Sequence, residues 1–277
     1  MSHHILLIGG HGKVSQLLTP LLLSRSWTIT SMIRSASQTP AIEALGTNQP
    51  GKLNVLVHSI GDVKTEADAQ QIIERVKPDW VVWSAGAGGK GGPETTLAID
   101  RDAAAAFTRA SVNTPSVKKF LTVSYLSSRR GRAGWWADSD WEAAQKTNNE
   151  ILPTYYKAKI AADEVLTVLS RERVQKEEKD GVPAKEQFAG ISLRPGILTD
   201  EKAGGVKVGK IGVGGDSSRG TVAHAIVAAL ETGFKGWVDV IDGDEEPTAG
   251  IQKLADQGID TAEGEDWEAA KERVAKL

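Results

Sequence analysis

Tyr155 and Lys159 lie four residues apart in the sequence, where a long amphipathic stretch begins. Residues with this spacing share one face of a helix, so we expect the phenol and the ammonium group to be neighbours. A neighbouring ammonium group lowers the pKa of a tyrosine from its ordinary value of about 10. Such a pair can pass a proton to or from a substrate oxygen near neutral pH. The alternative interpretation is a helix start with an aromatic anchor and exposed lysines.

A glycine turn near the N-terminus is the first element that could position such chemistry. Residues 5–8 are apolar and predict a buried strand, and Gly9 and Gly12 follow. Apolar residues then recur at helical spacing, at Val14, Leu17, Leu18, Leu21 and Leu22. Gly9 would permit a sharp turn, and Gly12 would let a pyrophosphate approach the N-terminus of the helix. The pattern predicts a dinucleotide-binding unit, with a glycine turn of another α/β protein as the alternative.

The second predicted strand, 28–33, ends in Arg34 and Ser35. Many NAD sites carry an acidic residue at this point, about 20 residues beyond the glycines, which binds the ribose 2′-hydroxyl. A cationic residue takes its place here, and Lys13 lies in the glycine turn. Arg34 and Lys13 would suit a 2′-phosphate, so the sequence favours NADP over NAD as the cofactor. An exposed arginine at the end of a strand is the alternative interpretation.

Strand and helix patterns alternate along the remaining chain. Further strands are predicted at 55–60, 80–83, 120–124, 190–194 and 237–241. Helices are predicted at 39–46, 65–76, 95–110, 155–179, 221–230 and 266–277, and a glycine-rich loop at 203–215. The alternation predicts an α/β fold, a doubly wound parallel sheet of the Rossmann type. We expect one domain over residues 1–277, in which residues 197–277 partly form a small C-terminal lobe on the substrate side.

Residues 129–154 interrupt the alternation with an insertion that is rich in tryptophan. Its tryptophans are Trp135, Trp136 and Trp141. The insertion could close over a substrate, or it could be a packed excursion on the surface. Asp138 and Asp140 lie between the tryptophans without a histidine at ligand spacing, so we expect no metal site.

Charge and composition exclude several functional classes. The 277 residues carry a net charge of −3, which gives no electrostatic case for nucleic-acid binding. No apolar run approaches the roughly 20 residues that cross a bilayer, and the N-terminus lacks the features of a signal peptide. The absence of cysteine rules out disulfides and suits a cytoplasmic location. Residues 275–277, Ala-Lys-Leu, resemble a peroxisomal address, although they also fit the end of an amphipathic helix.

The chain resembles the short-chain dehydrogenase/reductase superfamily, in its atypical, NAD(P)H-binding (NmrA-like) branch. The resemblance spans nearly the whole chain, and the residues that carry it occur in the family's order. They are the glycine turn 9–15, Arg34, Gly61-Asp62, the loop Ala85–Gly89, Ser124, Tyr155 with Lys159, the segment 194–200 and Ser218-Arg219. The resemblance implies a Rossmann fold and an oxidoreductase with a nicotinamide cofactor.

The resemblance also implies a set of cofactor contacts. They are Asp62 and Val63 at the adenine, Ala85 and Gly86 at the ribose and phosphates, and Pro195 and Ile197 at the nicotinamide, in addition to Gly9, Gly12, Lys13, Val14, Arg34 and Ser35. Lys159 would also hold the ribose of the nicotinamide. These contacts place the cofactor across the first crossover of the sheet.

Two regions depart from the family's pattern. The catalytic serine of the family lies near the end of the fifth strand, where Ser124 and Ser127 are both candidates. Tyr125 and Leu126 occupy positions where many relatives place small hydroxyl residues. The helix start at 219–221 reads Arg-Gly-Thr instead of the Arg-x-Asp of many relatives, so it lacks their acidic cap.

Three functions follow from these observations. The first is an NADP-dependent oxidoreductase that transfers hydride between nicotinamide and a carbonyl or alcohol of a small substrate. In it, Tyr155 would be the acid/base and Lys159 its partner, with Ser124 or Ser127 as the orienting hydroxyl. The second is a non-catalytic NADP-binding regulator that senses redox state, and the third is an epimerase or dehydratase with a tightly held cofactor. We expect a small-molecule substrate, no nucleic-acid or membrane partner, and a monomer or homodimer.

Overall fold

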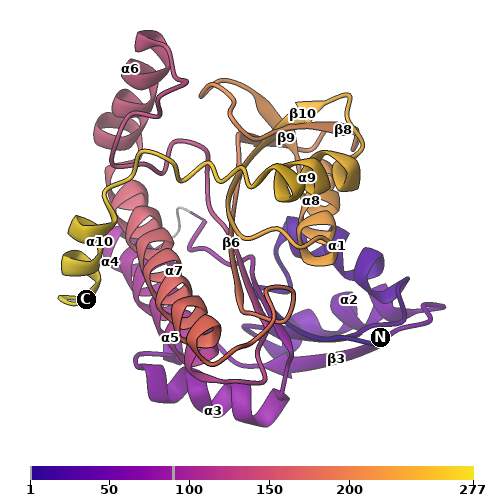
Figure 1. Cartoon of the computed structure of the whole chain (residues 1–277). Coiled ribbons are helices and arrows are strands. Elements are labelled where there is room, and N and C mark those ends of the chain that lie inside the picture. The colour runs from indigo at the N-terminus through magenta and orange to yellow at the C-terminus, as the bar shows by residue number, and fades with distance from the viewer. Residues whose placement is uncertain (1, 89–90) are drawn as a thin grey trace.

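Eight strands form the central sheet of the computed structural model, which describes residues 2–88 and 91–277 (Figure 1). They are β1 (His4–Ile8), β2 (Thr28–Ile33), β3 (Lys52–Val57), β4 (Trp80–Trp83), β5 (Lys119–Val123), β6 (Ala189–Pro195), β8 (Gly205–Val208) and β10 (Gly236–Gly243). Their order is β3-β2-β1-β4-β5-β6-β10-β8. Of these pairings only that of β10 with β8 is antiparallel, so the predicted doubly wound parallel sheet is confirmed. Two short strands, β7 (Ile197–Thr199) and β9 (Asp216–Ser218), pair separately.

Helices cover both faces of the sheet. They are α1 (Lys13–Leu23), α2 (Thr39–Glu43), α3 (Glu66–Val76), α4 (Gly92–Thr96), α5 (Ala104–Asn113), α6 (Asp138–Lys146), α7 (Pro153–Lys179), α8 (Arg219–Glu231), α9 (Pro247–Gln257) and α10 (Trp267–Val274). Short 3₁₀ or π-helical segments are η1 (Ala36–Gln38), η2 (Ala44–Gly46), η3 (Ile60–Asp62), η4 (Leu97–Ala103) and η5 (Thr147–Ile151). In the described part of the chain, no helix combines the length and the apolar character that crossing a membrane requires.

The core consists of two apolar layers, one on each face of the sheet. Side chains of α1, α8 and α9 form one layer, in which Leu18 and Ile226 are fully buried. Side chains of α3, α5 and α7 form the other, around Phe107 and Leu166. Figure 1 shows these two groups of helices on opposite sides of the strands. Strands covered on both faces carry unbroken apolar runs, which explains the composition of residues 5–8.

Two of the predicted elements that differ from the structure are the third strand and the loop at 203–215. β3 begins at Lys52 and ends at Val57, because it pairs residue for residue with all of β2. The end of the predicted strand, near Ile60, instead begins η3. The segment 203–215 is predicted to be a loop, yet it contains β8, which pairs with the end of β10. Its partner is distant in the sequence and its glycines hide any alternation, so no local pattern indicates this strand.

The helix start at 219–221 lacks the acidic cap of many relatives, and a serine caps it instead. Oγ of Ser218 accepts a hydrogen bond from the N–H of Thr221 at 3.1 Å. A serine in this position caps a helix as well as an aspartate does. The absence of the Arg-x-Asp pattern therefore leaves α8 with a satisfied first turn.

The tryptophan-rich insertion folds as α6 and η5 around a small apolar cluster of its own. Trp136 is buried there against Ala133 and Ala144. The indole N–H groups of Trp135 and Trp136 both donate to the carbonyl oxygen of Ile211, at 3.0 and 2.9 Å. The insertion is thus packed against the segment that precedes β9. Among the described residues, no group of three or more histidine, aspartate or glutamate side chains could hold a metal ion.

Candidate functional site

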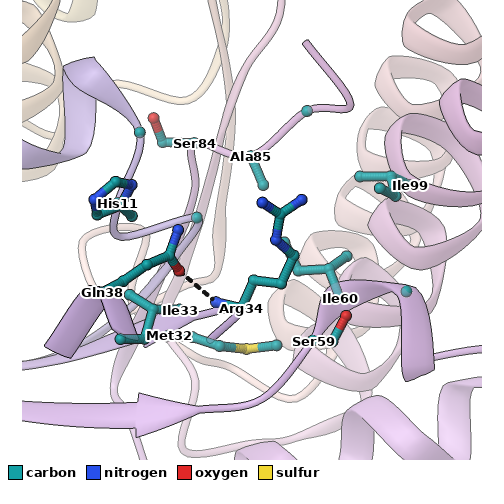
Figure 2. Close-up of a pocket in the computed structure, with 14 residues that line it drawn as sticks. His11, Met32, Ile33, Arg34, Gln38, Ser59, Ile60, Ser84, Ala85 and Ile99 are labelled. Carbon is teal, nitrogen blue, oxygen red and sulfur yellow. Dashed lines mark hydrogen bonds between the residues drawn. The ribbon is translucent and has the colours of Figure 1, made fainter. Parts of the chain in front are cut away.

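A cavity of about 300 Å³ opens at the carboxyl ends of β1 and β4 (Figure 2). Because β1 lies between β2 and β4, the strand order reverses at this point, and doubly wound sheets bind their ligands at such a reversal. We call it the switch-point cavity. The predicted contact residues that line it are Gly9, Gly12, Arg34, Ala85 and Gly86. Gly89, at the end of the predicted loop after β4, lies outside the described residues.

Gly9 gives the turn after β1 a conformation that other residues rarely adopt. Its φ is +85°, and a Cβ atom there would lie 2.8 Å from the Cα of Ala85. The N–H of Gly12 donates to the carbonyl oxygen of Gly9 at 2.8 Å and closes the turn. No side chain caps α1, which begins at Lys13, so its first N–H groups can bind an anionic ligand. A phosphate group fits this glycine cradle.

Arg34 reaches into the switch-point cavity from the end of β2. Figure 2 shows its guanidinium group near Ala85 and Ile60. Oε1 of Gln38 accepts hydrogen bonds from the backbone N–H groups of Arg34 and Ser35, at 3.1 and 3.2 Å. Ser35 caps the 3₁₀ turn that follows. This turn fixes the backbone at the strand end, and the guanidinium group lines the cavity.

The other predicted cofactor contacts lie outside the lining of this cavity. They are Lys13, Val14, Ser35, Asp62, Val63, Lys159, Pro195 and Ile197. Val14 and Val63 are core residues, whereas Asp62 is exposed at the end of η3. Pro195 and Ile197 lie at and after the end of β6, which β4 and β5 separate from β1. A ligand that contacts both the switch-point cavity and Pro195 or Ile197 must therefore extend along the carboxyl edge of the sheet.

Lys13 and Arg219 meet at one carboxylate beside the start of α1. Asp200 accepts a hydrogen bond from Nζ of Lys13 at 2.7 Å and from Arg219 at 2.6 Å. These two cations hold the pKa of Asp200 below its ordinary value, and the hydrogen bond from Lys13 has the largest effect. Positive charge therefore gathers where a phosphate-bearing ligand would meet the helix N-terminus.

Tyr155 and Lys159 lie one turn apart near the start of α7. Lys159 is only 2% exposed, and its Nζ donates to the carbonyl oxygen of Val123 at 2.7 Å. Val123 is the last residue of β5, so this bond fixes the ammonium group at the carboxyl edge of the sheet. The ring of Tyr155 packs against that of Tyr125, with the ring centroids 5.1 Å apart. The pair thus stands at the same edge as the switch-point cavity.

The pKa of Tyr155 is raised, whereas its spacing from Lys159 predicts a lowered pKa. Burial raises the pKa of the phenol, and the carboxylates of Asp100 and Asp163 raise it further. The lowered pKa that the Tyr155–Lys159 spacing predicts is not found, because burial and two acidic neighbours both raise it. Tyr155 is therefore a neutral phenol near neutral pH.

Ser124 and Ser127 differ in what their hydroxyl groups contact. The hydroxyl of Ser124 is buried and donates to Oδ2 of Asp163 at 2.6 Å. The same carboxylate accepts hydrogen bonds from Ser128 and Ser192, at 2.7 and 2.8 Å. Ser127 is 6% exposed, and no residue in the described ranges forms a hydrogen bond with its hydroxyl group. Of these two serines, Ser127 is therefore the one whose hydroxyl proton is not already donated to a described residue.

Several residues of the site were not assigned from the sequence. The cavity is also lined by His11, Met32, Ile33, Gln38, Ser59, Ile60, Gly61, Ser84 and Ile99. Gln38 could have been found from the spacing Ser35-x-x-Gln38, which is that of a capping box. Asp100 in η4 is 1% exposed and lies behind the loop after β4, where no local pattern indicates it.

The sequence that forms this site matches a known family. A model of the NAD(P)H-binding family matches residues 9–233. The chain belongs to this family. It is 30% identical to a UPF0659 protein of Schizosaccharomyces pombe over 223 residues, which are 79% of this chain and 81% of that protein. It is 28% identical to a Bacillus subtilis protein named as an uncharacterized sugar epimerase over 256 residues, 90% of this chain and 99% of that one.

A solved structure shares the fold of this NAD(P)H-binding chain. It is described as an NAD-dependent epimerase/dehydratase from Bacillus halodurans, with a TM-score of 0.69 and 19% identity over 91% of this chain and 100% of that one. Family membership confirms the NAD(P)H-binding resemblance and identifies the cofactor as a nicotinamide dinucleotide. The residues present fit such a group, since the turn at Gly9 excludes a Cβ atom and α1 begins without a side-chain cap.

Proposed function

We propose that this protein is an NADP-dependent oxidoreductase that interconverts a carbonyl group and an alcohol on a small substrate. The observation that carries the proposal is the placement of Tyr155 and Lys159 at the sheet edge where the switch-point cavity opens. Hydride transfer to a carbonyl group needs a dinucleotide site and a positioned proton donor. The glycine cradle and Tyr155 supply these two parts.

Arg34 and the start of α1 would hold the cofactor. The N–H groups of the first helical turn would bind the pyrophosphate, and the guanidinium group of Arg34 would bind the 2′-phosphate that distinguishes NADP from NAD. Lys13 and Arg219 add positive charge nearby. When bound, the nicotinamide supplies or accepts the hydride.

Tyr155 would give a proton to the substrate oxygen in reduction and remove it in oxidation. Lys159 presents a buried ammonium group at the end of β5, where it could bind the ribose. The hydroxyl of Ser127 could donate to the same substrate oxygen, whereas the proton of Ser124 is engaged by Asp163. The ring of Tyr125 forms an apolar wall beside Tyr155, which favours a substrate with an apolar part.

Fluorescence titration with NADPH and NADH, followed by turnover on a panel of carbonyl compounds, tests the proposal. We expect NADPH to bind more tightly than NADH. Tyr155→Phe should keep this binding, while turnover falls about 10²–10⁴-fold because the proton donor is lost. Tyr156→Phe is a matched control, since the hydroxyl of this adjacent tyrosine donates to the carbonyl oxygen of Arg129 at 3.0 Å. Undiminished turnover by Tyr155→Phe would remove the acid/base, and no binding of either nucleotide would overturn the whole proposal.

An epimerase or dehydratase with a tightly held cofactor is the second candidate. It is favoured by the name of the Bacillus subtilis relative, which matches over 90% of this chain. Such an enzyme returns the hydride to its substrate, so it would convert substrate without net oxidation of NADPH. Cofactor retained through purification together with this behaviour would support it. Binding that discriminates oxidised from reduced cofactor, with no turnover on any substrate, would instead favour a regulator.

A further inference from the structure

A second cavity, of about 280 Å³, lies between α10 and the first half of α7. Figure 1 shows these two helices side by side. The described residues that line it differ from those that line the switch-point cavity, and its α10 side lies beyond residues 9–233, which the family model matches. We call it the α10 cavity. Neither the NAD(P)H-binding family nor the proposed reaction therefore accounts for it.

The charged side chains that line the α10 cavity are mostly cationic. The whole chain has 33 basic and 36 acidic residues, so an excess of cations here is a local property. Among the described residues of the lining, Glu164 is the only acidic one. The basic ones are Arg101, Arg130, Lys157, Arg273 and Lys276. Charge complementarity therefore favours an anionic ligand.

Glu164 holds two of these guanidinium groups in place. Its side chain is only 3% exposed, whereas those of Arg130 and Arg273 are 37% exposed. Nε and Nη2 of Arg130 donate to the two carboxylate oxygens of Glu164, at 3.0 and 3.2 Å. Nε and Nη2 of Arg273 both donate to Oε1 of Glu164, at 2.9 and 2.6 Å. Nη1 of both arginines donates to no acceptor within residues 2–88 and 91–277, so two fixed cations share one negative charge and keep donors for a second anion.

The remaining cations of the lining add to this positive charge. Arg101 pairs with Asp102, with Nε and Oδ1 2.6 Å apart, so these two charges nearly cancel. Lys157 on α7 and Lys276 after α10 are exposed, and each adds one positive charge. A main-chain carboxylate at Leu277 would add one negative charge and still leave the cations in excess. The α10 cavity therefore carries a net positive charge at neutral pH.

Aliphatic side chains form the rest of the lining. They are Ala161, Val165, Val274 and Leu277. Val165 and Val274 belong to the buried apolar cluster that joins α7 to α10. Cations beside an aliphatic wall suit an anion with an apolar body better than a bare ion. Guanidinium groups bind phosphate groups through parallel N–H donors, and the two charges of a phosphate monoester match several cations better than the single charge of a carboxylate does.

We propose that the α10 cavity binds a phosphate monoester with a small apolar body. In this site, Arg130 and Arg273 contact the phosphate group, Lys157 and Lys276 add charge at the rim, and the aliphatic side chains contact the apolar body. Glu164 is the positioning residue that keeps the two guanidinium groups together. The site is separate from the switch-point cavity, so it does not depend on the oxidoreductase activity proposed above.

Calorimetric titration with phenyl phosphate tests the proposal, because this probe joins a phosphate group to a small apolar ring. We expect the wild-type protein to bind it with the same Kd in the absence and presence of NADPH. Benzoate has the same ring and a single charge, so it should bind at least about tenfold more weakly. Binding of phenyl phosphate that NADPH abolishes would assign it to the switch-point cavity and overturn the proposal. Equal binding of benzoate would contradict the preference for a phosphate group.

Variants of the lining locate the binding site. Arg273→Gln removes one fork of donors, so the Kd for phenyl phosphate should rise about 10–100-fold. Lys157→Glu reverses an exposed charge and leaves the pairs of Glu164 intact, so it tests the proposal even if Arg273→Gln does not fold. Its Kd should rise about fivefold at low salt and less at high salt.

Lys179→Glu is the matched control. It makes the same charge reversal at an exposed position of the same helix, at the end of α7 that lies far from the cavity. We expect it to leave the Kd for phenyl phosphate unchanged. An unchanged Kd in Lys157→Glu, or an equal rise in Lys157→Glu and Lys179→Glu, would overturn the proposal.

Discussion

The hydroxyl group of Ser124 donates a hydrogen bond to Oδ2 of Asp163 at 2.6 Å, and both side chains are buried. A hydroxyl group has one proton, so Ser124 cannot donate to a substrate oxygen while it donates to this carboxylate. The hydroxyl of Ser127 has no hydrogen-bond partner within residues 2–88 and 91–277. The geometry thus distinguishes two serines that are equal candidates in the sequence.

Replacement of these serines by alanine should have different effects. Ser124→Ala leaves a buried carboxylate with one donor fewer, so the free energy of unfolding should fall by about 1–3 kcal/mol. Ser127→Ala should leave that free energy nearly unchanged and lower kcat/KM about 10²-fold, as the loss of one donor to a reacting oxygen does. Denaturant unfolding and steady-state kinetics measure the two effects. The reverse pattern would restore Ser124 as the orienting hydroxyl.

Arg34→Ala should weaken the binding of NADPH and spare that of NADH. Hydrogen bonds to charged groups contribute about 1.5–3 kcal/mol, so the Kd for NADPH should rise about 10–100-fold. Calorimetric titration of each nucleotide gives both constants. Arg75→Ala, which removes an exposed arginine of α3, should change neither. An equal loss for the two nucleotides would assign Arg34 to a part of the cofactor that both share.

Asp200→Ala should tighten the binding of NADPH. Asp200 is 65% exposed and pairs with Lys13 and Arg219 beside the start of α1, so an anionic ligand must compete with it. Exposed ion pairs are weak and are screened by salt, so the Kd should fall by no more than about fivefold at low salt and less at high salt. Asp216→Ala, an exposed change on β9, is the control. Weaker binding by Asp200→Ala would show that this carboxylate orders the site instead.

Lys119 should make stability depend on pH in the alkaline range. Burial lowers its pKa from 10.5 to about 8, and its Nζ donates to the carbonyl oxygens of Leu230 and Thr232. Between these two values the unfolded chain binds more protons than the folded protein. The free energy of unfolding therefore rises with pH, by up to about 3 kcal/mol from this group between pH 8 and 10.5.

Lys119→Met should lack this rise, because its side chain does not titrate. Urea unfolding at the two ends of the range gives the difference. Lys118→Met removes an exposed lysine next to it and should keep the wild-type slope. Identical slopes for wild-type protein and Lys119→Met would show that another group is responsible.

Local patterns in the sequence predict much of this fold. The predicted strands at Thr28–Ile33 and Trp80–Trp83 have the observed bounds, because apolar runs and the residues that end them are local signals. β8 and the start of β3 depend on pairing with β10 and β2, so their bounds are set by distant residues. α9 has no counterpart among the predictions.

In the site, too, the sequence predicts features that depend on local spacing and misses those that depend on tertiary packing. Gly9, Gly12 and Arg34 were predicted from their spacing and line the switch-point cavity. The raised pKa of Tyr155 could not be predicted, because it depends on burial and on Asp100, which approaches only when η4 packs on α7. Spacing within one helix predicts which residues are neighbours, but not the dielectric surroundings they share.

The single carbonyl oxygen of Ile211 accepts both indole N–H groups of Trp135 and Trp136. A few residues further along, the carbonyl oxygen of Gly215 accepts the N–H of Ile197. The insertion is therefore mechanically linked to the segment that follows β6. Lifting the insertion would break two hydrogen bonds at one atom and pull on Ile197 as well.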